Sequence, residues 1–113
     1  MVNVTPDVIE ALQQTGLKVY DEGFLTKDTK MPCISIMEYE NANIGNGKTI
    51  AYSEIVYHIK VWSTKQSELI SYSAQIDKIM HSLHFQRTST NDLIQNSVRQ
   101  RKLKYKATAF ENY

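Results

Sequence analysis

Tyr52-Ser-Glu-Ile-Val-Tyr-His-Ile-Lys-Val-Trp-Ser63 forms most of the longest predicted strand of the chain, which extends from Thr49 to Ser63. Successive side chains of a strand point to opposite faces, so the composition of each face follows from the sequence. One face carries Ile55, Tyr57, Ile59 and Val61, and the other carries Tyr52, Val56, His58 and Trp62. Because both faces hold large apolar groups, we expect helices to cover one face and a neighbouring subunit to cover the other.

An amphipathic helix is predicted directly after this strand. Ser63 and Thr64, with Glu68 further along, are suitable N-cap residues, and the helix extends to about Leu83. Its apolar stripe consists of Leu69, Tyr72, Ile76, Ile79 or Met80, and Leu83. A stripe with this spacing is typical of a helix that packs on a sheet.

The last predicted strand, Val98–Phe110, alternates between apolar and basic side chains. Leu103, Tyr105, Ala107 and Ala109 point one way, and Lys102, Lys104, Lys106 and Thr108 point the other. The strand therefore presents three lysines on one face.

The remaining segments complete a sheet with two helices. Thr5 is a good N-cap and Pro6 suits the first helical position, so a first helix is predicted from Pro6 to about Thr15, ending at Gly16. The other predicted elements are strands at Leu17–Tyr20, Cys33–Glu40 and Phe85–Thr90, a polar loop at Glu22–Pro32, and turns at Asn41–Lys48 and Asn91–Asp92. This order predicts one domain, residues 1–113, of the α+β class: a mainly antiparallel β-sheet with an N-terminal helix and a second amphipathic helix packed on it.

Composition excludes several classes of protein. With 113 residues, 42% hydrophobic and 22% charged, the chain is long and apolar enough to fold as one domain. No apolar run approaches the roughly 18 residues of a membrane span, and the polar N-terminus is not a signal peptide, so we expect no membrane partner. The one cysteine, Cys33, excludes an internal disulfide and favours a reducing compartment such as the cytoplasm.

The net charge of +1 hides a polarised distribution. Residues 1–57 contain 4 basic and 8 acidic side chains, whereas residues 58–113 contain 9 basic and 4 acidic. The basic excess is densest at Arg99, Arg101, Lys102, Lys104 and Lys106. Such a chain can associate head to tail with its own copies or face a polyanion, or the charges can serve only to keep a strand edge soluble.

None of the candidate catalytic motifs supports an enzymatic function. Ala42-Asn-Ile-Gly-Asn-Gly-Lys48-Thr49 matches a loose phosphate-binding loop, but that loop needs a helix after it and a strand is predicted instead. His58, His81 and His84 do not have metal-ligand spacing, and Cys33 beside Pro32 is read as a packing residue. We therefore expect no enzymatic activity, no cofactor and no metal.

For nucleic acid, Lys102, Lys104 and Lys106 would place three ammonium groups about 6–7 Å apart on one face. No basic recognition helix and no set of exposed aromatic residues accompanies them. The protein sequence therefore permits non-specific contact with DNA and argues against recognition of specific base sequences.

The arrangement of elements resembles a known family. Its pieces are Cys33-Ile-Ser-Ile-Met-Glu-Tyr39 after a proline, His58-Ile-Lys-Val-Trp62-Ser63, the helix with Ile76-Asp-Lys-Ile-Met-His-Ser-Leu83, and Lys102-Leu-Lys-Tyr-Lys-Ala107. Over residues 5–110 the chain resembles the tail-completion, or tail-terminator, proteins of long-tailed, siphovirus-type bacteriophages. The resemblance lies in the order of elements more than in residue identities.

The resemblance implies a structural role in the virion. Such proteins form a ring, typically a hexamer, on the head-proximal end of the tail tube, where the ring stops polymerisation and joins the head. The implied partners are copies of the chain, the tail-tube protein and a head-connector or head-completion protein. The implied location is the virion, after synthesis in the cytoplasm of the bacterial host. DNA passes through the ring, so Lys102, Lys104 and Lys106 are candidates for a DNA-facing strand or for contact with the next subunit.

A second interpretation stays open. The chain can also be a small α+β nucleic-acid- or protein-binding module that uses the basic C-terminal strand as its binding face. Light scattering across a concentration series and electron microscopy of labelled virions would separate the two.

Overall fold

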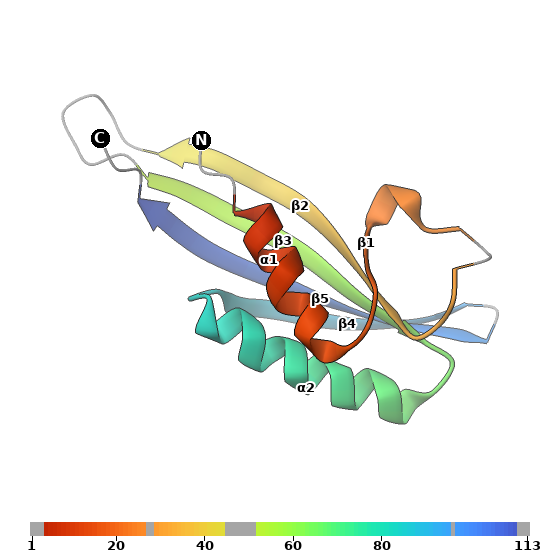
Figure 1. Ribbon diagram of the computed structural model, residues 1–113. Coiled ribbons are helices and arrows are strands. Elements are labelled where there is room, and N and C mark those ends of the chain that lie inside the picture. The colour runs from red at the N-terminus through yellow and green to blue at the C-terminus, as the bar shows by residue number, and fades with distance from the viewer. Residues whose placement is uncertain (1–3, 27–28, 45–51, 96, 111–113) are drawn as a thin grey trace.

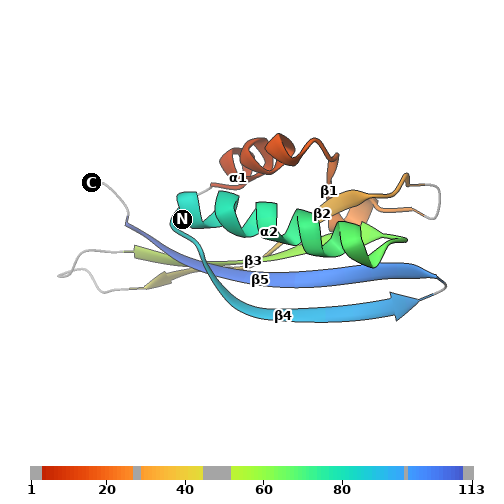
Figure 2. The ribbon, with the colours of Figure 1, turned by 90° about the horizontal axis from the view of Figure 1, so that it is seen from below.

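The computed structural model describes residues 4–26, 29–44, 52–95 and 97–110. Within these residues, five strands form one sheet in the order β1-β2-β3-β5-β4, and two α-helices lie on one of its faces (Figures 1 and 2). The elements are α1 (Thr5–Leu12), η1 (Gln13–Thr15), β1 (Val19–Asp21), η2 (Glu22–Phe24), β2 (Cys33–Ile44), β3 (Tyr52–Ser63), α2 (Gln66–Ser82), β4 (Gln86–Gln95) and β5 (Val98–Phe110). Only β1 and β2 pair in parallel among the described strands, so the predicted α+β fold with a mainly antiparallel sheet is confirmed.

The core lies between the helices and one face of β3, as predicted, and the structure decides which face this is. Ile55, Tyr57, Ile59 and Val61 are buried there, together with Leu103 and Tyr105 of β5, Ile34 and Ile36 of β2, Val8 and Leu12 of α1, and Leu69, Ile76 and Met80 of α2. Each such side chain contributes about 1.5–3 kcal/mol when it leaves water. The helix stripe is confirmed in part, because Tyr72, Ile79 and Leu83 lie at its border and Ser73 is also buried.

Both predicted helix starts differ in detail. Thr5 lies inside α1 and Val4 is the N-cap residue, without a side-chain cap. The Thr5 hydroxyl instead meets the Tyr57 hydroxyl at 2.5 Å and donates to the Glu38 carboxylate at 3.1 Å, which ties α1 to the sheet. At the other end, Gly16 adopts φ +83°, where an L side chain is strained, and ends the helical segment as predicted.

Helix α2 starts one or two residues later than predicted, so Ser63 lies two residues before the N-cap residue. Lys65 is the N-cap residue and has no side-chain cap. The Ser63 hydroxyl accepts the Lys65 N–H at 3.1 Å and donates to Glu68 at 2.8 Å. Ser63 and Glu68 therefore fix the entry of the chain into the helix from outside it.

Two predicted turns are wrong where the structure describes them. β4 continues through Asn91 and Asp92 to Gln95, because Asp92 accepts two hydrogen bonds from the Arg101 side chain on β5. In addition, β4 is an edge strand of the sheet, and an edge strand tolerates polar residues. β2 continues from Asn41 to Ile44, where pairing with β3 outweighs the weak strand preference of asparagine. The rest of the predicted Asn41–Lys48 turn, including Lys48, and the start of the next strand at Thr49 lie outside the described residues.

Candidate functional site

The candidate site is the open face of the sheet, opposite the helices (Figure 2). Lys102, Lys104 and Lys106 point to this face, because they alternate with Leu103 and Tyr105, which are buried under the helices. The strand register sets the lysines opposite Lys60, His58 and Val56 of β3, respectively. The predicted alternation of β5 is therefore confirmed, and it builds a basic surface from two neighbouring strands.

The lysines of this face differ in their partners. Lys60 forms an ion pair with Glu22 of η2, and Lys106 lies 3.5 Å from Glu54 of β3. Lys102 and Lys104 have no carboxylate within ion-pair distance among the described residues. Like charges directly opposite one another on a sheet are destabilising, so the Lys60–Lys102 pair depends on the neutralising carboxylate of Glu22.

An aromatic ring at a β-bulge lies on the same face. The register between β2 and β3 shifts between Glu38 and Glu40, which leaves Tyr39 without a directly paired residue. The ring of Tyr39 stacks on His58 at 4.5 Å between centroids and an interplanar angle of 12°. The Lys104 Nζ atom lies 5.7 Å from the centroid of Tyr39, within range of a cation–π contact. Tyr39 therefore contacts both His58 and Lys104.

His58 is the most unusual group of the site. Its side chain is only 8% exposed, and its Nε2 atom has no hydrogen-bond partner among the described residues. Burial lowers the pKa of His58, and the charges of Lys102 and Lys104 lower that pKa further, whereas the charge of Glu22 raises it. The imidazole is thus held towards its neutral form in the absence of a bound anion.

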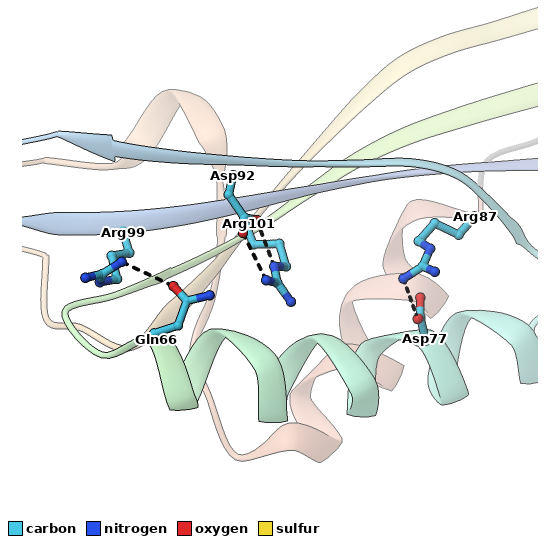
Figure 3. A network of polar contacts seen from close by, with 6 residues as sticks. All are labelled: Gln66, Asp77, Arg87, Asp92, Arg99 and Arg101. Carbon is cyan, nitrogen blue, oxygen red and sulfur yellow. Dashed lines mark hydrogen bonds and ion pairs between the residues drawn. The ribbon is translucent and has the colours of Figure 1, made fainter.

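The arginines near the lysines face the other way. Arg99 and Arg101 share the parity of Leu103, so they lie on the helix side, where Arg99 donates to Gln66 and Arg101 to Asp92 (Figure 3). Asp92 accepts both hydrogen bonds from Arg101, at 2.8 and 2.9 Å, and these bonds lower the pKa of the Asp92 carboxyl. The dense basic segment of the sequence therefore divides between hydrogen-bonded arginines on the helix side and lysines on the open face.

Sequence reasoning missed Tyr39 and His58 as members of this site. The strand face of each follows from simple alternation, since Tyr39 shares a face with Met37 and His58 with Trp62. Nothing in the sequence told which strand lies beside which, so their contact with Lys104 was not predicted.

The other candidate groups stay apart from this cluster. Cys33 is fully buried, donates to the Met31 sulfur at 3.8 Å, and burial raises its pKa to about 11. His81 lies in the last turn of α2, and His84 lies beyond its end, as predicted. In the part of the chain that the structure describes, no group of three or more metal-ligating side chains lies together. No described helix is long and apolar enough to cross a membrane.

Solved structures include chains with a similar fold. A chain from the virion of a native gene transfer agent particle superposes with a TM-score of 0.59 and 16% sequence identity, over 92% of this chain and 85% of that chain. The match shows a shared fold. No protein-family model matches the sequence, and no curated protein matches it.

Proposed function

We propose that this chain is a structural assembly protein of a phage-like virion that forms a ring on the head-proximal end of the tail tube. The observation that carries the proposal is the fold match to a virion chain over nearly the whole length of both chains. In this role the ring stops polymerisation of the tube protein and presents the surface that binds the head-connector or head-completion protein. The function needs no cofactor and no catalytic residue, and the protein resides in the virion after synthesis in the host cytoplasm.

The two edges of the sheet support self-assembly. β1 pairs only with Ile34–Ile36 of β2, so the outer edge of β2 from Met37 to Ile44 has no strand beside it among the described residues. β4 forms the opposite edge, and all its side chains from Gln86 to Ile94 are exposed. Free strand edges pair readily with another chain. Pairing of the β4 edge of one copy with the β2 edge of the next is a head-to-tail contact, which gives a ring when the rotation closes.

The charge distribution of the chain agrees with a head-to-tail contact. Residues 1–57 carry 8 acidic and 4 basic side chains, and residues 58–113 carry 9 basic and 4 acidic. The β2 edge, with the exposed Glu38 and Glu40, belongs to the acidic half and β4 belongs to the basic half, so the opposite net charges favour encounter of one end of the chain with the other end of its neighbour. We take the hexamer as the stoichiometry that the family resemblance implies.

In such a ring we propose that Lys102, Lys104 and Lys106 line the lumen. Their face of the sheet carries no helix in the described residues, so it is free to point inward (Figure 2). Three cations from each subunit would give a positive collar for the phosphate backbone of passing DNA. The competing arrangement places these lysines outside, against the acidic half of the neighbouring chain.

Loss of the gene tests the proposed function. If the chain caps the tube, its deletion should give tubes of uncontrolled length and heads without tails, and labelled wild-type virions should carry the protein at the head–tail junction in electron micrographs. Normal virions from the deletion strain would exclude the capping role. Label elsewhere in the virion would retain a structural role and exclude this position.

The alternative function is a small nucleic-acid- or protein-binding module, and the open face with Tyr39, His58 and Lys104 favours it. Two results together would support this alternative. The chain would be strictly monomeric and bind DNA, and deletion of its gene would leave the virions unaffected.

A further inference from the structure

A single ring nitrogen on the open face has no partner in the described part of the chain. His58 is more than nine-tenths buried, yet its Nε2 atom makes no hydrogen bond there. Buried polar atoms are normally hydrogen-bonded, so an unpaired one requires an explanation such as a missing ligand. The groups that face His58 are Tyr39 from β2, Lys60 from β3, Lys102 and Lys104 from β5, and Glu22 from η2.

The charges around His58 are unbalanced. Lys60 and Glu22 neutralise one another as an ion pair, whereas Lys102 and Lys104 have no carboxylate partner among the described residues. Lys104 stands directly opposite His58 in the strand register. The arrangement therefore combines an unpaired ring nitrogen with two uncompensated ammonium groups, and an anion is the ligand that it lacks.

We propose that His58, Lys102 and Lys104 form a binding site for the phosphate groups of a nucleic-acid backbone. The two ammonium groups supply the counter-charge, and they reorient towards the phosphate when it binds. The His58 Nε2 atom is shielded from solvent in the free chain, and it donates a hydrogen bond to a phosphate oxygen once the lysine side chains have moved. Tyr39 fixes the plane of the imidazole by stacking on it and is itself 59% exposed, so it also offers a surface for a base.

An extended polyanion fits this surface better than the carboxylates of a neighbouring subunit. Lys102 and Lys104 continue into Lys106 at a regular spacing along β5, and evenly spaced cations suit a regular phosphate backbone. Glu38 accepts a hydrogen bond from Thr5 on the helix side, and Glu40 of the edge strand β2 shares the register of Val56 and Lys106 on the open face. One such carboxylate does not repeat along the length of β5 as the phosphates of a nucleic-acid backbone do.

Phosphate binding at this site is coupled to protonation of His58. In the free protein, burial and the two lysines hold the pKa of His58 below its ordinary value. A bound phosphate adds negative charge beside the ring and favours the imidazolium, so the pKa of His58 rises on binding. A group whose pKa is higher in the bound state strengthens binding as the pH falls, so affinity for DNA increases from pH 8 towards about pH 5.

The test is an NMR titration of the carbon-bound imidazole protons of His58 in the full chain, with and without a short DNA duplex. We expect the pKa of His58 to rise by roughly one unit at saturating DNA. In K102Q/K104Q the affinity for the duplex should fall about tenfold or more at low salt, and the slope of log affinity against log salt should fall by about 2. The matched control K18Q/K78Q removes the same charge elsewhere and should leave both nearly unchanged.

His58→Gln should keep the salt-dependent binding and lose its dependence on pH. An unchanged pKa of His58 at saturating DNA would overturn the proposal, and so would an equal loss of affinity in the K18Q/K78Q control. Equal binding of a polyglutamate peptide at the same salt would assign the site to protein carboxylates and overturn the phosphate assignment. The inference adds a ligand to the proposed lumen face, but it is measured on the isolated chain. If the isolated chain does not bind DNA, the ring proposal is unaffected. If the chain forms no ring, the phosphate-binding site is unaffected.

Discussion

Asp77 joins α2 to the last two strands through two short hydrogen bonds. It accepts from the Tyr105 hydroxyl at 2.5 Å and from Arg87 at 2.8 Å (Figure 3 shows the latter). Tyr105 is 1% exposed, and burial is the main cause that raises its pKa, followed by its hydrogen bond to Asp77. Burial and the Asp77 carboxylate together keep the phenol of Tyr105 neutral, and the same carboxylate anchors the first residues of β4.

This arrangement predicts a loss of stability in alkali. An unfolded tyrosine ionises near pH 10, whereas the pKa of folded Tyr105 is raised, so its stabilising effect is complete below about pH 10 and is lost as the pH rises towards the folded pKa. Tyr105→Phe should lower the free energy of unfolding by about 1–3 kcal/mol at pH 7 and make the alkaline loss shallower. The Tyr105→Phe variant should still lose some stability in alkali, because burial also raises the pKa of Tyr57. Urea unfolding from neutral to alkaline pH measures both effects, with Tyr20→Phe as control, and an unchanged alkaline slope in Tyr105→Phe would contradict the assignment.

The thiol of Cys33 is predicted to be inert in the folded protein. It is fully buried, and burial raises its pKa to about 11, so both access and the thiolate fraction are small at neutral pH. Labelling by a thiol-specific reagent should be at least about tenfold slower in the native chain than in urea. Equal rates in the two conditions would show that the strand opens readily at this position.

At the scale of elements, β4 is a long edge strand that ends in exposed apolar side chains. Leu93 and Ile94 are 53% and 61% exposed. If β4 pairs with the neighbouring copy, replacing both by lysine should prevent ring formation, since lysines on an edge oppose strand pairing. The monomer should keep its stability to within about 0.5 kcal/mol per substitution, because neither side chain is buried.

The matched control for this experiment is Ile70→Lys. Ile70 is 54% exposed on α2, so the substitution makes the same chemical change away from the sheet edge. Sedimentation of the free chain and electron microscopy of assembled tails would compare the variants. Rings of normal size with lysine at both β4 positions would exclude this edge as the contact.

At the scale of the whole molecule, the chain is a single curved sheet with an apolar face under two helices and a basic face without them (Figure 2). The ends of β2, β3 and β5 extend past the helices (Figure 1). The principal extents are 53 × 25 × 22 Å. Such an elongated, two-faced shape suits a subunit that places one face against a lumen and its two edges against neighbours.

Charge reversal of the basic face tests the lumen assignment. With Lys102, Lys104 and Lys106 all replaced by glutamate, the monomer should fold, because these side chains are not in the core, and passage or ejection of DNA should be impaired. Infectivity and DNA release measure the effect, and thermal unfolding of the monomer confirms the fold. A variant that forms rings and infects normally would show that the lysines do not face the DNA.

The candidate site was predictable in part. The alternation of side chains along β5 places Lys102 and Lys104 on the face opposite Leu103. The same alternation predicts that Arg99 and Arg101 lie on the helix side, where the structure has them. The contact of Tyr39 with His58 and Lys104 was not predictable, because it depends on which strands lie side by side, β2 beside β3 and β3 beside β5. The bulge at Tyr39 was not predictable either, because only the partner strand reveals where the register shifts.

The sequence by itself determined the α+β class, the amphipathic helix and the two faces of β3 and β5, because these follow from local periodicity and from the difference in water affinity between the faces. Only the tertiary structure decided that β5 inserts between β3 and β4, and that β4 continues through Asn91 and Asp92. Turn preference at those two residues is weak compared with a continuous ladder of backbone hydrogen bonds and the ion pair of Asp92 with Arg101. Strand order, register and the meeting of His58 with Lys104 are non-local pairings, and local sequence preferences contain no record of which distant segment supplies the partner.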